Sequence, residues 1–301
     1  MSVALASQAN WPSIVQKDLS MVFSDQYRQF ESMLGAVCTM KDATQGIEHD
    51  LEVGDIGEMS QFSEGSIAFS SPTEGYKKDT EEEQWALGIK ATRQLLRNDL
   101  YGVLRNRTAA LADAARDKRE AIGASPFVDG FSSSFTTGDG LSLFNSAHTN
   151  KQNSTTQGNS GSSAFSPAAV EATRLLMLKF KTNADNKMAV RMDTLIVPAD
   201  LEEKAYELIK SSGKVDTANN NRNFHQGKYS LIVWENYLAD ANNWFAADSK
   251  LMKRYLLYRE WEPTQFFRSG EFDTMVSKFA VYFSANISSV DWRFAYGHAV
   301  S

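Results

Sequence analysis

The sequence has almost no cysteine: Cys38 is the only one among 301 residues. A single cysteine excludes an intrachain disulfide and fits a reducing compartment, and its simplest role is that of a buried small apolar residue. No run of about 18 apolar residues occurs, and the start, MSVALASQANWPS, has neither a basic segment nor a continuous apolar one. We therefore expect a soluble globular protein without a membrane span or a signal peptide.

Basic residues are scarce relative to acidic ones, with 31 Lys and Arg against 37 Asp and Glu and a net charge of -6. Proteins that grip nucleic acid neutralise its phosphates with clustered Lys and Arg. The densest basic group, Arg116–Arg119, is interrupted by Asp117 and followed by Glu120, which is typical of a solvated or subunit-facing helix surface. The composition disfavours tight direct DNA binding, while a hydrophobic share of 42% suffices for a buried core.

Recognisable catalytic and metal-binding patterns are also missing. The four histidines, His49, His148, His225 and His298, stand far apart, and none has cysteines or carboxylates at metal-ligand spacing. Ser146 precedes His148 by two residues, but no G-x-S-x-G motif frames it, so we predict that His148 is a hydrogen-bonding loop residue. Neither a phosphate-binding loop nor a G-x-G-x-x-G motif after a strand occurs. We predict no catalytic, cofactor-binding or metal-binding residues, no cofactor and no enzymatic activity.

The most regular stretch is Asn98–Ile122, which we predict to be one long amphipathic helix of roughly 35 Å. Asn98 or Asp99 would cap its first turn, and Gly123 with Pro126 would end it. The side chains expected on its buried face are Leu100, Leu104, Leu111, Ala115 and Ile122. Those expected to point away from the core are Arg105, Arg116, Lys118, Arg119 and Glu120.

Two segments before this helix carry apolar side chains without an obvious core. Residues 1–45 are predicted to be an extended arm with one or two short helical pieces, the first opened by Pro12. Residues 46–91 are acidic and dotted with glycine; Ile67 and Phe69 alternate before a turn at 70–72, and residues 85–89 alternate after it. That pattern predicts a long two-stranded hairpin. An isolated ribbon is marginal in water, so it must lie on its own domain or on a neighbouring subunit.

The remaining segments combine loops, helices and strands. Residues 132–166 are rich in Ser, Thr, Gly and Asn and predict a mobile surface loop. Ser166–Phe180 predicts a helix with Val170, Leu175, Leu176 and Leu178 toward a core; Thr194–Pro198 predicts a buried strand, and a second helix ends at Gly213. Residues 228–235, 242–248, 253–261, 272–287 and 291–300 predict short strands that form a closing meander. The fold class is α+β.

Taken in order, these features resemble a known family. A loop reading LFNSAHTN after a long helix, a polar stretch, a helix, LIVPADLEEKAYEL, a β region with Trp244 and a terminal DWRFAYG look like the major capsid proteins of tailed bacteriophages. The similarity covers roughly residues 46–301, is closest to Mu-like head subunits, and implies the Hong Kong 97-type fold. It implies an N-terminal arm (1–45), an E-loop hairpin (46–91), a P-domain with spine helix and mobile loop (92–164), an A-domain (165–270) and returning P-domain strands (271–301).

The resemblance also implies a structural function. Copies would assemble as hexamers and pentamers into an icosahedral shell around double-stranded DNA, with the arm and the hairpin lying on neighbouring subunits. The implied partners are a scaffold, a portal and, in some members, decoration proteins, and the packaged DNA would be contacted weakly and without sequence preference. The implied location is the virion, after assembly in the cytoplasm of a bacterial host. Deleting Val53–Lys78 should then leave a soluble subunit that no longer assembles.

The sequence departs from the family pattern in two ways. Some members begin with about a hundred charged helical residues that act as a scaffold; this sequence has none, so a separate scaffold or a cleaved precursor is expected. Some members cross-link a lysine to an asparagine; Lys77, Lys78 and Asn286 exist, but no catalytic glutamate is identifiable, and we predict no cross-link.

The alternatives are an encapsulin-like compartment with enzyme cargo and an α+β enzyme, which needs a cleft with convergent polar groups.

Overall fold

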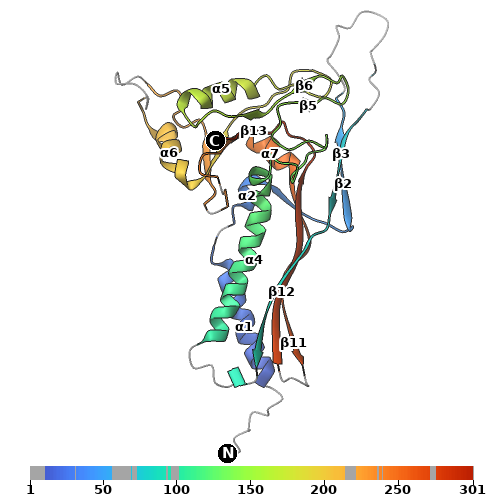
Figure 1. The fold of residues 1–301 in the computed structure, drawn as a ribbon, viewed down its shortest axis with the longest axis vertical. Coiled ribbons are helices and arrows are strands. Elements are labelled where there is room, and N and C mark those ends of the chain that lie inside the picture. The colour runs from blue at the N-terminus through green and yellow to red at the C-terminus, as the bar shows by residue number, and fades with distance from the viewer. Residues whose placement is uncertain are drawn as a thin grey trace, which may run out of the picture.

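A computed structural model of the chain describes residues 11–30, 32–55, 69, 73–92, 94–95, 102–213, 222–235, 237–238, 240–271 and 276–300. The described part is elongated (Figure 1). Its lower half holds two long helices beside long strands, and its upper half holds shorter helices around a second sheet. Within these residues, no helix has the length and apolar character needed to span a bilayer.

The helices of the described residues are α1 (Trp11–Arg28), α2 (Leu34–Val37), α4 (Val103–Val128), α5 (Pro167–Met177), α6 (Glu202–Lys210), which follows a 3-10 turn at Ala199–Leu201, and α7 (Ser249–Tyr255). The strands are β1 (Thr39–Asp42), β2 (Ile47–Val53), β3 (Glu74–Glu81), β4 (Gln84–Thr92), β5 (His148–Thr149), β6 (Thr156–Gln157), β7 (Ser160–Gly161), β8 (Thr194–Val197), β9 (Ser230–Val233), β10 (Trp244–Ala247), β11 (Leu256–Glu271), β12 (Val276–Ser289) and β13 (Ala295–His298). The α+β class is confirmed.

The strands form two main sheets and two small pairs. The lower sheet has the order β1-β11-β12-β4, and the upper sheet has the order β7-β13-β10-β8-β9. β2 pairs with β3, and β5 pairs with β6. The predicted single meander is therefore wrong, because β11 and β12 belong to the lower sheet while β13 crosses to the upper one. A boundary at residue 270 would also separate β11 from β12, although the two strands pair along their whole length.

The helix α4 packs against β12 and β4 and forms the spine of the lower half. Leu104, Leu111, Ala115 and Ile122 are buried, as predicted, whereas Leu100 and the caps proposed at Asn98 and Asp99 lie outside the described residues. The prediction that Glu120 points away from the core is wrong: its side chain is buried and accepts a hydrogen bond from the Ser32 hydroxyl.

The predicted end of this helix is also wrong, because α4 continues past Gly123 and Pro126 to Val128. A Cβ at Gly123 would lie 2.0 Å from Leu34 Cδ2, so the glycine allows α2 to pack closely against the helix. Pro126 cannot donate to the carbonyl of Ile122, but the Ser125 hydroxyl donates to that oxygen at 2.8 Å. Tertiary packing and one side-chain hydrogen bond thus offset the two helix-breaking residues.

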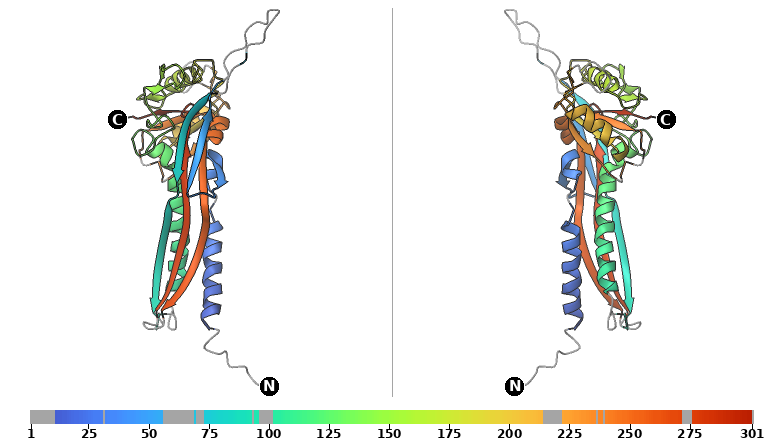
Figure 2. Two further views of the ribbon diagram at one scale, coloured as in Figure 1. Left: turned by 90° about the vertical axis from the view of Figure 1, so that its right-hand side faces the viewer. Right: turned by 90° about the vertical axis from the view of Figure 1, so that its left-hand side faces the viewer.

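The N-terminal segment is more regular than predicted. Residues 11–28 form the 18-residue helix α1, which lies beside α4 and contacts β11 of the same chain (Figure 2). Leu19 and Phe23 are buried, Phe23 stacks on Phe266 with ring centroids 5.2 Å apart, and Gln26 donates to Asp113 at 3.0 Å. For these residues, the expectation of an extended arm is wrong, because they form a helix whose Leu19 and Phe23 pack on their own chain; Met21 is 58% exposed. Contact of the arm with an adjacent subunit stays a prediction.

The upper half surrounds a dense aromatic core. Phe245 in β10 lies 5.2 Å from Phe127 and 5.1 Å from Phe144, measured between ring centroids, and Trp244 is fully buried. The predicted strand at 194–198 and the predicted helix at 166–180 correspond to β8 and α5. Ser166 caps α5 by accepting from the backbone N–H of Ala169.

The predicted inward face of α5 is mostly wrong. Val170 is buried, but Leu175, Leu176 and Leu178 are 41–50% exposed, and Thr173 and Met177 occupy the buried positions instead. The predicted strand at 253–261 is partly wrong, because Lys253–Tyr255 complete α7, whose first turn is capped by Asp248. The strand β11 begins only at Leu256.

Candidate functional site

The hairpin formed by β2 and β3 is the longer of the two strand pairs that lie outside the main sheets. The sequence prediction placed the second strand at residues 85–89, and this is wrong: those residues belong to β4, which pairs with β12. Ile67 and the turn proposed at residues 70–72 lie outside the described residues. In the observed register, His49 faces Asp79 and Leu51 faces Lys77, and the Gly54 N–H donates to the Thr73 carbonyl at 2.9 Å beyond the paired strands.

The two faces of this hairpin are inverted relative to an ordinary surface ribbon. On β2 the acidic residues Glu48, Asp50 and Glu52 turn toward the body of the molecule and are partly buried. Ile47, Leu51 and Val53 turn outward and are 44%, 55% and 78% exposed. Carboxylates normally remain in water and aliphatic side chains are normally buried, so this arrangement needs an explanation. We call the exposed side, made of Ile47, His49, Leu51, Val53, Lys77, Asp79 and Glu81, the outward face.

Two arginines from distant parts of the chain hold the inward acidic face. Arg259 in β11 forms ion pairs with Asp50 and Glu48, and its side chain is 8% exposed. Arg293 lies 3.8 Å from Glu52, measured between Nη1 and Oε1, and its side chain is 3% exposed. Burial and the neighbouring Asp291 carboxylate raise the pKa of Glu52. The hairpin is therefore fixed to its own body by charge pairs, together with hydrogen bonds such as that from Thr80 Oγ1 to Ser288 Oγ at 2.7 Å.

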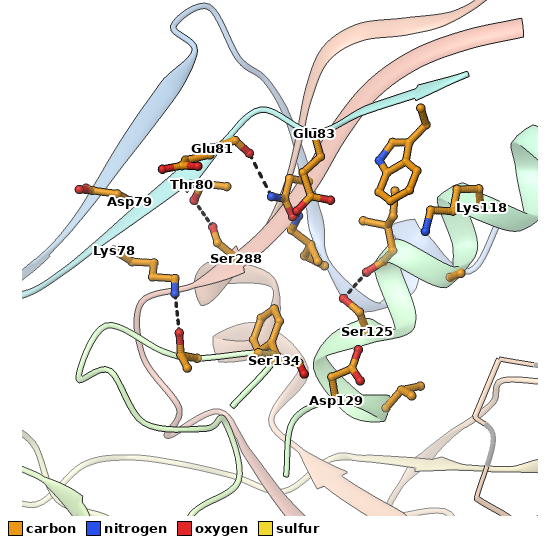
Figure 3. A pocket seen from close by; sticks show the side chains of 18 of the residues that line it. Lys78, Asp79, Thr80, Glu81, Glu83, Lys118, Ser125, Asp129, Ser134 and Ser288 are labelled. Atoms are coloured by element: carbon orange, nitrogen blue, oxygen red, sulfur yellow. Dashed lines mark hydrogen bonds between the residues drawn. The ribbon is translucent and has the colours of Figure 1, made fainter. Parts of the chain in front are cut away.

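A cleft of about 630 Å³ lies between the hairpin base, the end of α4 and the loop at 134–136 (Figure 3). Lys78 Nζ donates to Thr136 Oγ1 at 2.8 Å, and burial lowers the pKa of this ammonium group. Lys118 Nζ lies 3.6 Å from the ring centroid of Trp85. The remaining charged lining residues are Asp79, Glu81, Glu83 and Asp129, so the cleft contains both positive and negative side chains. Among its lining residues, no nucleophile is hydrogen-bonded to a base in the way that catalysis requires.

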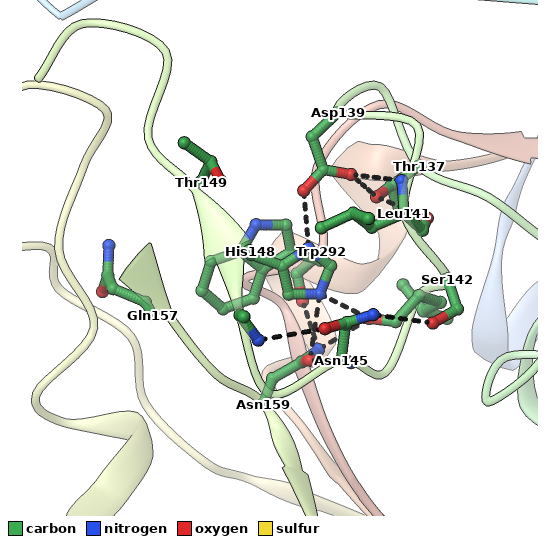
Figure 4. A network of polar contacts seen from close by, with 12 residues as sticks. Thr137, Asp139, Leu141, Ser142, Asn145, His148, Thr149, Gln157, Asn159 and Trp292 are labelled. Carbon is green, nitrogen blue, oxygen red and sulfur yellow. Dashed lines mark hydrogen bonds and ion pairs between the residues drawn. The ribbon is translucent and has the colours of Figure 1, made fainter. Parts of the chain in front are cut away.

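The loop predicted to be mobile is instead held by a buried polar network (Figure 4). His148 lies between Asp139, with Nδ1 2.6 Å from Oδ2, and Asn159, with Nε2 3.2 Å from Oδ1, and its ring stacks on Trp292 at 4.3 Å. Asn159 is fully buried; it accepts from the Asn145 N–H and donates to the carbonyls of Leu143 and Ala295. The polar side chains thus satisfy the loop backbone, and the prediction of mobility at 132–166 is wrong.

The four histidines occupy separate environments. The prediction that His148 makes hydrogen bonds is confirmed, although it lies in the two-residue strand β5, and no contact joins it to Ser146 among the described interactions. His49 pairs with Asp79 on the outward face, and His225 lies 3.3 Å from the Tyr229 hydroxyl. Among the described residues, no group of His, Cys, Asp or Glu side chains is arranged to hold a metal ion.

His298 in β13 is buried between two polar contacts that fix its neutral form. Its Nδ1 accepts from the Ser163 N–H at 3.2 Å, so Nε2 carries the proton and faces Thr173 Oγ1 at 2.8 Å. The ring also stacks on Trp244 with centroids 4.2 Å apart. Burial lowers the pKa of His298 to about 4. A second proton would remove the hydrogen bond from Ser163.

This histidine makes the stability of the subunit pH-dependent. The folded-state pKa is lower than the unfolded value of 6.5, so the unfolded chain takes up the proton first as the pH falls, and folding stability is lost from pH 6.5 down to about 4. We expect this residue alone to remove about 3 kcal/mol between pH 7 and 4. Urea unfolding of the unassembled subunit measures this loss. The difference in free energy of unfolding between wild type and His298→Gln should be about 3 kcal/mol smaller at pH 4 than at pH 7. An unchanged gap would contradict the assignment.

The comparisons with known proteins agree with this geometry. The chain is similar in fold to a Microbacterium phage Oxtober96 structure, with a TM-score of 0.59 at 10% identity, over 90% of this chain and 92% of that one. It is similar to the mature capsid of bacteriophage PhiM1, with a TM-score of 0.60 at 7% identity over 91% and 88% of the two chains. A virus-like particle from Pyrococcus furiosus gives a TM-score of 0.53 at 10% identity over 94% and 98%.

The spine helix on a long sheet, the upper five-stranded unit and the anchored hairpin together form the Hong Kong 97-type capsid fold. The model of the phage capsid protein family matches residues 75–297, and the chain belongs to this family. It is therefore a structural protein of a phage capsid. No curated protein sequence matches the chain. The closer likeness to Mu-like head subunits stays a prediction.

Sequence reasoning missed the inward arginines and the inverted hairpin. The segment IEHDLEV does alternate acidic and apolar residues at period two, so the two faces of β2 could have been read from the sequence. The sequence gives no sign of which face is buried, because that depends on Arg259 and Arg293, more than 200 residues away. Only the fold shows that the acidic face is the inward one.

Proposed function

We propose that this chain is the major head protein of a tailed bacteriophage and that its copies form hexamers and pentamers of an icosahedral shell around double-stranded DNA. The observation that carries the proposal is the outward face of the hairpin. Its aliphatic side chains are exposed while its carboxylates are paired inside, and exposed apolar surface on an ordered element marks an interaction site. In a shell, another copy would cover this face.

The helix α1 supports assembly less directly, because its described side chains Leu19 and Phe23 are covered within one copy, although Met21 is exposed. The hairpin differs, since its inner face is already fixed by Arg259 and Arg293, whereas the aliphatic side chains of Ile47, Leu51 and Val53 on its outer face stay exposed. Such a one-sided surface suits a heterologous contact, in which two different patches meet and the contact repeats into closed rings.

The remaining parts of the proposal concern chemistry and partners. The protein would have no catalytic activity, and a separate scaffold and a portal would take part in assembly in the bacterial cytoplasm. The acidic net charge of -6 favours weak, salt-sensitive contact with the packaged DNA, because tight phosphate binding would hinder packing and ejection. We assign the descriptive names arm, E-loop, P-domain and A-domain to residues 1–45, the β2–β3 hairpin, the lower sheet with α4, and the upper sheet with its helices.

Electron microscopy of the purified protein, together with its sedimentation, tests the proposal. Large regular shells are expected, and a stable small species under all assembly conditions would overturn it. The contents of shells isolated from infected cells distinguish a phage head from the encapsulin-like alternative: DNA is expected, and enzyme cargo without DNA would favour the alternative. Strong binding of empty shells to DNA at physiological salt would contradict the proposed weak contact.

A further inference from the structure

The proposed function makes no use of the buried pair formed by His148 and Asp139 (Figure 4). The His148 side chain is fully buried, and that of Asp139 is 3% exposed. The ring nitrogen Nδ1 lies 2.6 Å from Asp139 Oδ2, and Nε2 lies 3.2 Å from the Leu143 carbonyl oxygen and from Asn159 Oδ1. Both nitrogens are hydrogen-bonded, so the nature of their partners decides how many protons the ring holds.

Asn159 turns its side-chain oxygen toward the ring. Its Nδ2 atom lies 2.9 Å from the carbonyl oxygen of Leu143 and 3.0 Å from that of Ala295, and both of these groups only accept. Its Oδ1 atom accepts from the Asn145 N–H at 3.0 Å. The opposite orientation of the amide would place its oxygen against two carbonyls and its nitrogen against an N–H, so it is excluded. Nε2 of His148 therefore faces two acceptors and carries a proton.

The other ring nitrogen faces an ionised carboxylate. Asp139 Oδ1 accepts from the Thr137 hydroxyl at 2.6 Å and from the Leu141 N–H at 3.1 Å. Burial raises the pKa of Asp139, but the hydrogen bonds from His148 and Thr137 lower it, and the net shift is downward. An ionised carboxylate only accepts, so Nδ1 also carries a proton. With a proton on each nitrogen, the His148 ring is an imidazolium cation.

The surroundings of this ring suit a cation. The Trp292 ring stacks on it with centroids 4.3 Å apart and 8° between the planes, and Asp139 supplies the opposite charge. The other titratable or charged groups near the pair are Tyr76 and Lys78 of β3, on which the Asp139 carboxylate acts, and Arg293, whose guanidinium carbon lies 4.8 Å from the Trp292 ring centroid. Loss of a ring proton would leave Asp139 as a buried carboxylate without its counter-charge.

His148 also begins the β5–β6 pair, whose turn holds the outer end of the described hairpin. Three hydrogen bonds join the turn and the hairpin: Tyr76 Oη donates to the Thr149 carbonyl at 2.7 Å, Lys151 Nζ to the Gly75 carbonyl, and Gln152 Nε2 to Thr73 Oγ1. The base of the hairpin is held separately, by the ion pairs of Arg259. Because Thr149 follows His148 directly, the position of the ring sets the position of the turn and of the strand end that the turn holds.

We propose that His148 is a doubly protonated clamp: its pairing with Asp139 holds the turn at 149–152, and through it the outer end of the hairpin, until a ring proton is lost at alkaline pH. A neutral ring would direct a lone pair at an acceptor in either tautomer, at the Asp139 carboxylate or at Asn159 Oδ1. The clamped form thus holds one proton more than a released form, because an exposed imidazole is mostly neutral above pH 7. A rising pH therefore favours release. The hairpin base stays held, because the Arg259 guanidinium keeps its charge.

Hydrogen exchange of the unassembled subunit, followed by mass spectrometry between pH 7 and 9, tests the clamp. After correction for the intrinsic pH dependence of amide exchange, the protection of residues 73–76 and 149–157 should fall by at least about tenfold over this range, because release of one proton allows up to about tenfold per pH unit. The protection of β11 and β12 should stay constant. In His148→Gln, whose side chain does not titrate, the same two segments should be poorly protected already at pH 7 and should show no pH dependence.

His298→Gln is the matched control, because it replaces a buried histidine that is neutral at pH 7, and it should keep the wild-type response. Nuclear magnetic resonance of the wild-type subunit, labelled with nitrogen-15 in its histidine rings, counts the ring protons without any variant. His148 should show two protonated nitrogens at pH 8. A single protonated nitrogen, or constant protection of the wild type, would overturn the clamp. Neither measurement involves shells, so its failure leaves the proposed function untouched.

Discussion

Removing Val53–Lys78 is expected to yield a subunit that folds but forms no shells. Neither main sheet contains β2 or β3, so both sheets and α4 retain their pairing. The deletion removes Val53, the most exposed aliphatic side chain of β2, and most of β3, so the surface that another copy would cover is disrupted. Sedimentation and electron microscopy measure the assembled fraction, and circular dichroism with urea unfolding measures the fold.

A point variant separates docking from folding more sharply than the deletion. In Leu51→Asp with Val53→Asp, two side chains that are more than half exposed become charged, so the free energy of unfolding should change by less than about 1 kcal/mol. Assembly should nevertheless fall to background, because an unpaired charge would be buried in the contact. The matched control, Leu51→Met, should assemble normally. Normal shells from the double variant would refute the role given to the hairpin.

Arg293→Met is expected to be the most destabilising single substitution that we propose. The guanidinium is buried; it donates to Asp291 at 2.9 Å, to the carbonyl of Lys181 at 2.8 Å, and to the side-chain oxygens of Asn150 and Asn183 at 2.7 and 2.8 Å. Removing one partner of a buried ion pair leaves the other charge, here Asp291, without compensation, at a cost of about 3–5 kcal/mol. The free energy of unfolding of a single domain is about 5–15 kcal/mol, so this substitution removes much of the stability.

Urea unfolding of the unassembled subunit measures this loss, and two controls identify its cause. Arg293→Lys keeps the positive charge but not the several N–H donors of the guanidinium. Its free energy of unfolding should therefore fall by less than that of Arg293→Met. Arg293→Met combined with Asp291→Asn removes both charges of the pair and should recover part of the stability. If the double variant were as unstable as the sum of the two single changes, the uncompensated charge would not be the cause.

Local pattern was sufficient where periodicity and capping act within one element. The spacing of Leu104, Leu111 and Ile122 predicted a helix with the observed buried face, and Ser166 correctly marked the start of α5. A strand was predicted at residues 272–287, and in β12 the alternating residues Phe279, Val281 and Phe283 are buried. The ordered combination of such elements also sufficed to indicate the capsid fold.

Local pattern failed where distant residues decide the outcome. The composition of residues 132–166 predicted mobility, but the side chains of His148 and Asn159 bond to groups up to 136 residues away and order the loop. Gly123 and Pro126 predicted a helix end, but Leu34 and the Ser125 hydroxyl allow the helix to continue. The loop is ordered by tertiary contacts, whereas in the helix the packing of Leu34 and a local hydrogen bond from Ser125 offset helix-propensity costs of about 1 kcal/mol for Gly and about 3 kcal/mol for Pro.

The sequence by itself determined the acidic net charge, the α+β succession of elements and the alternation of acidic and apolar residues in IEHDLEV, although the predicted hairpin had the wrong second strand. Only the tertiary structure decided which side of that hairpin faces outward, because burying a carboxylate requires a paired cation, and Arg259 and Arg293 are brought to it by the folding of β11 and the chain after β12. That placement leaves the aliphatic side for another copy of the chain.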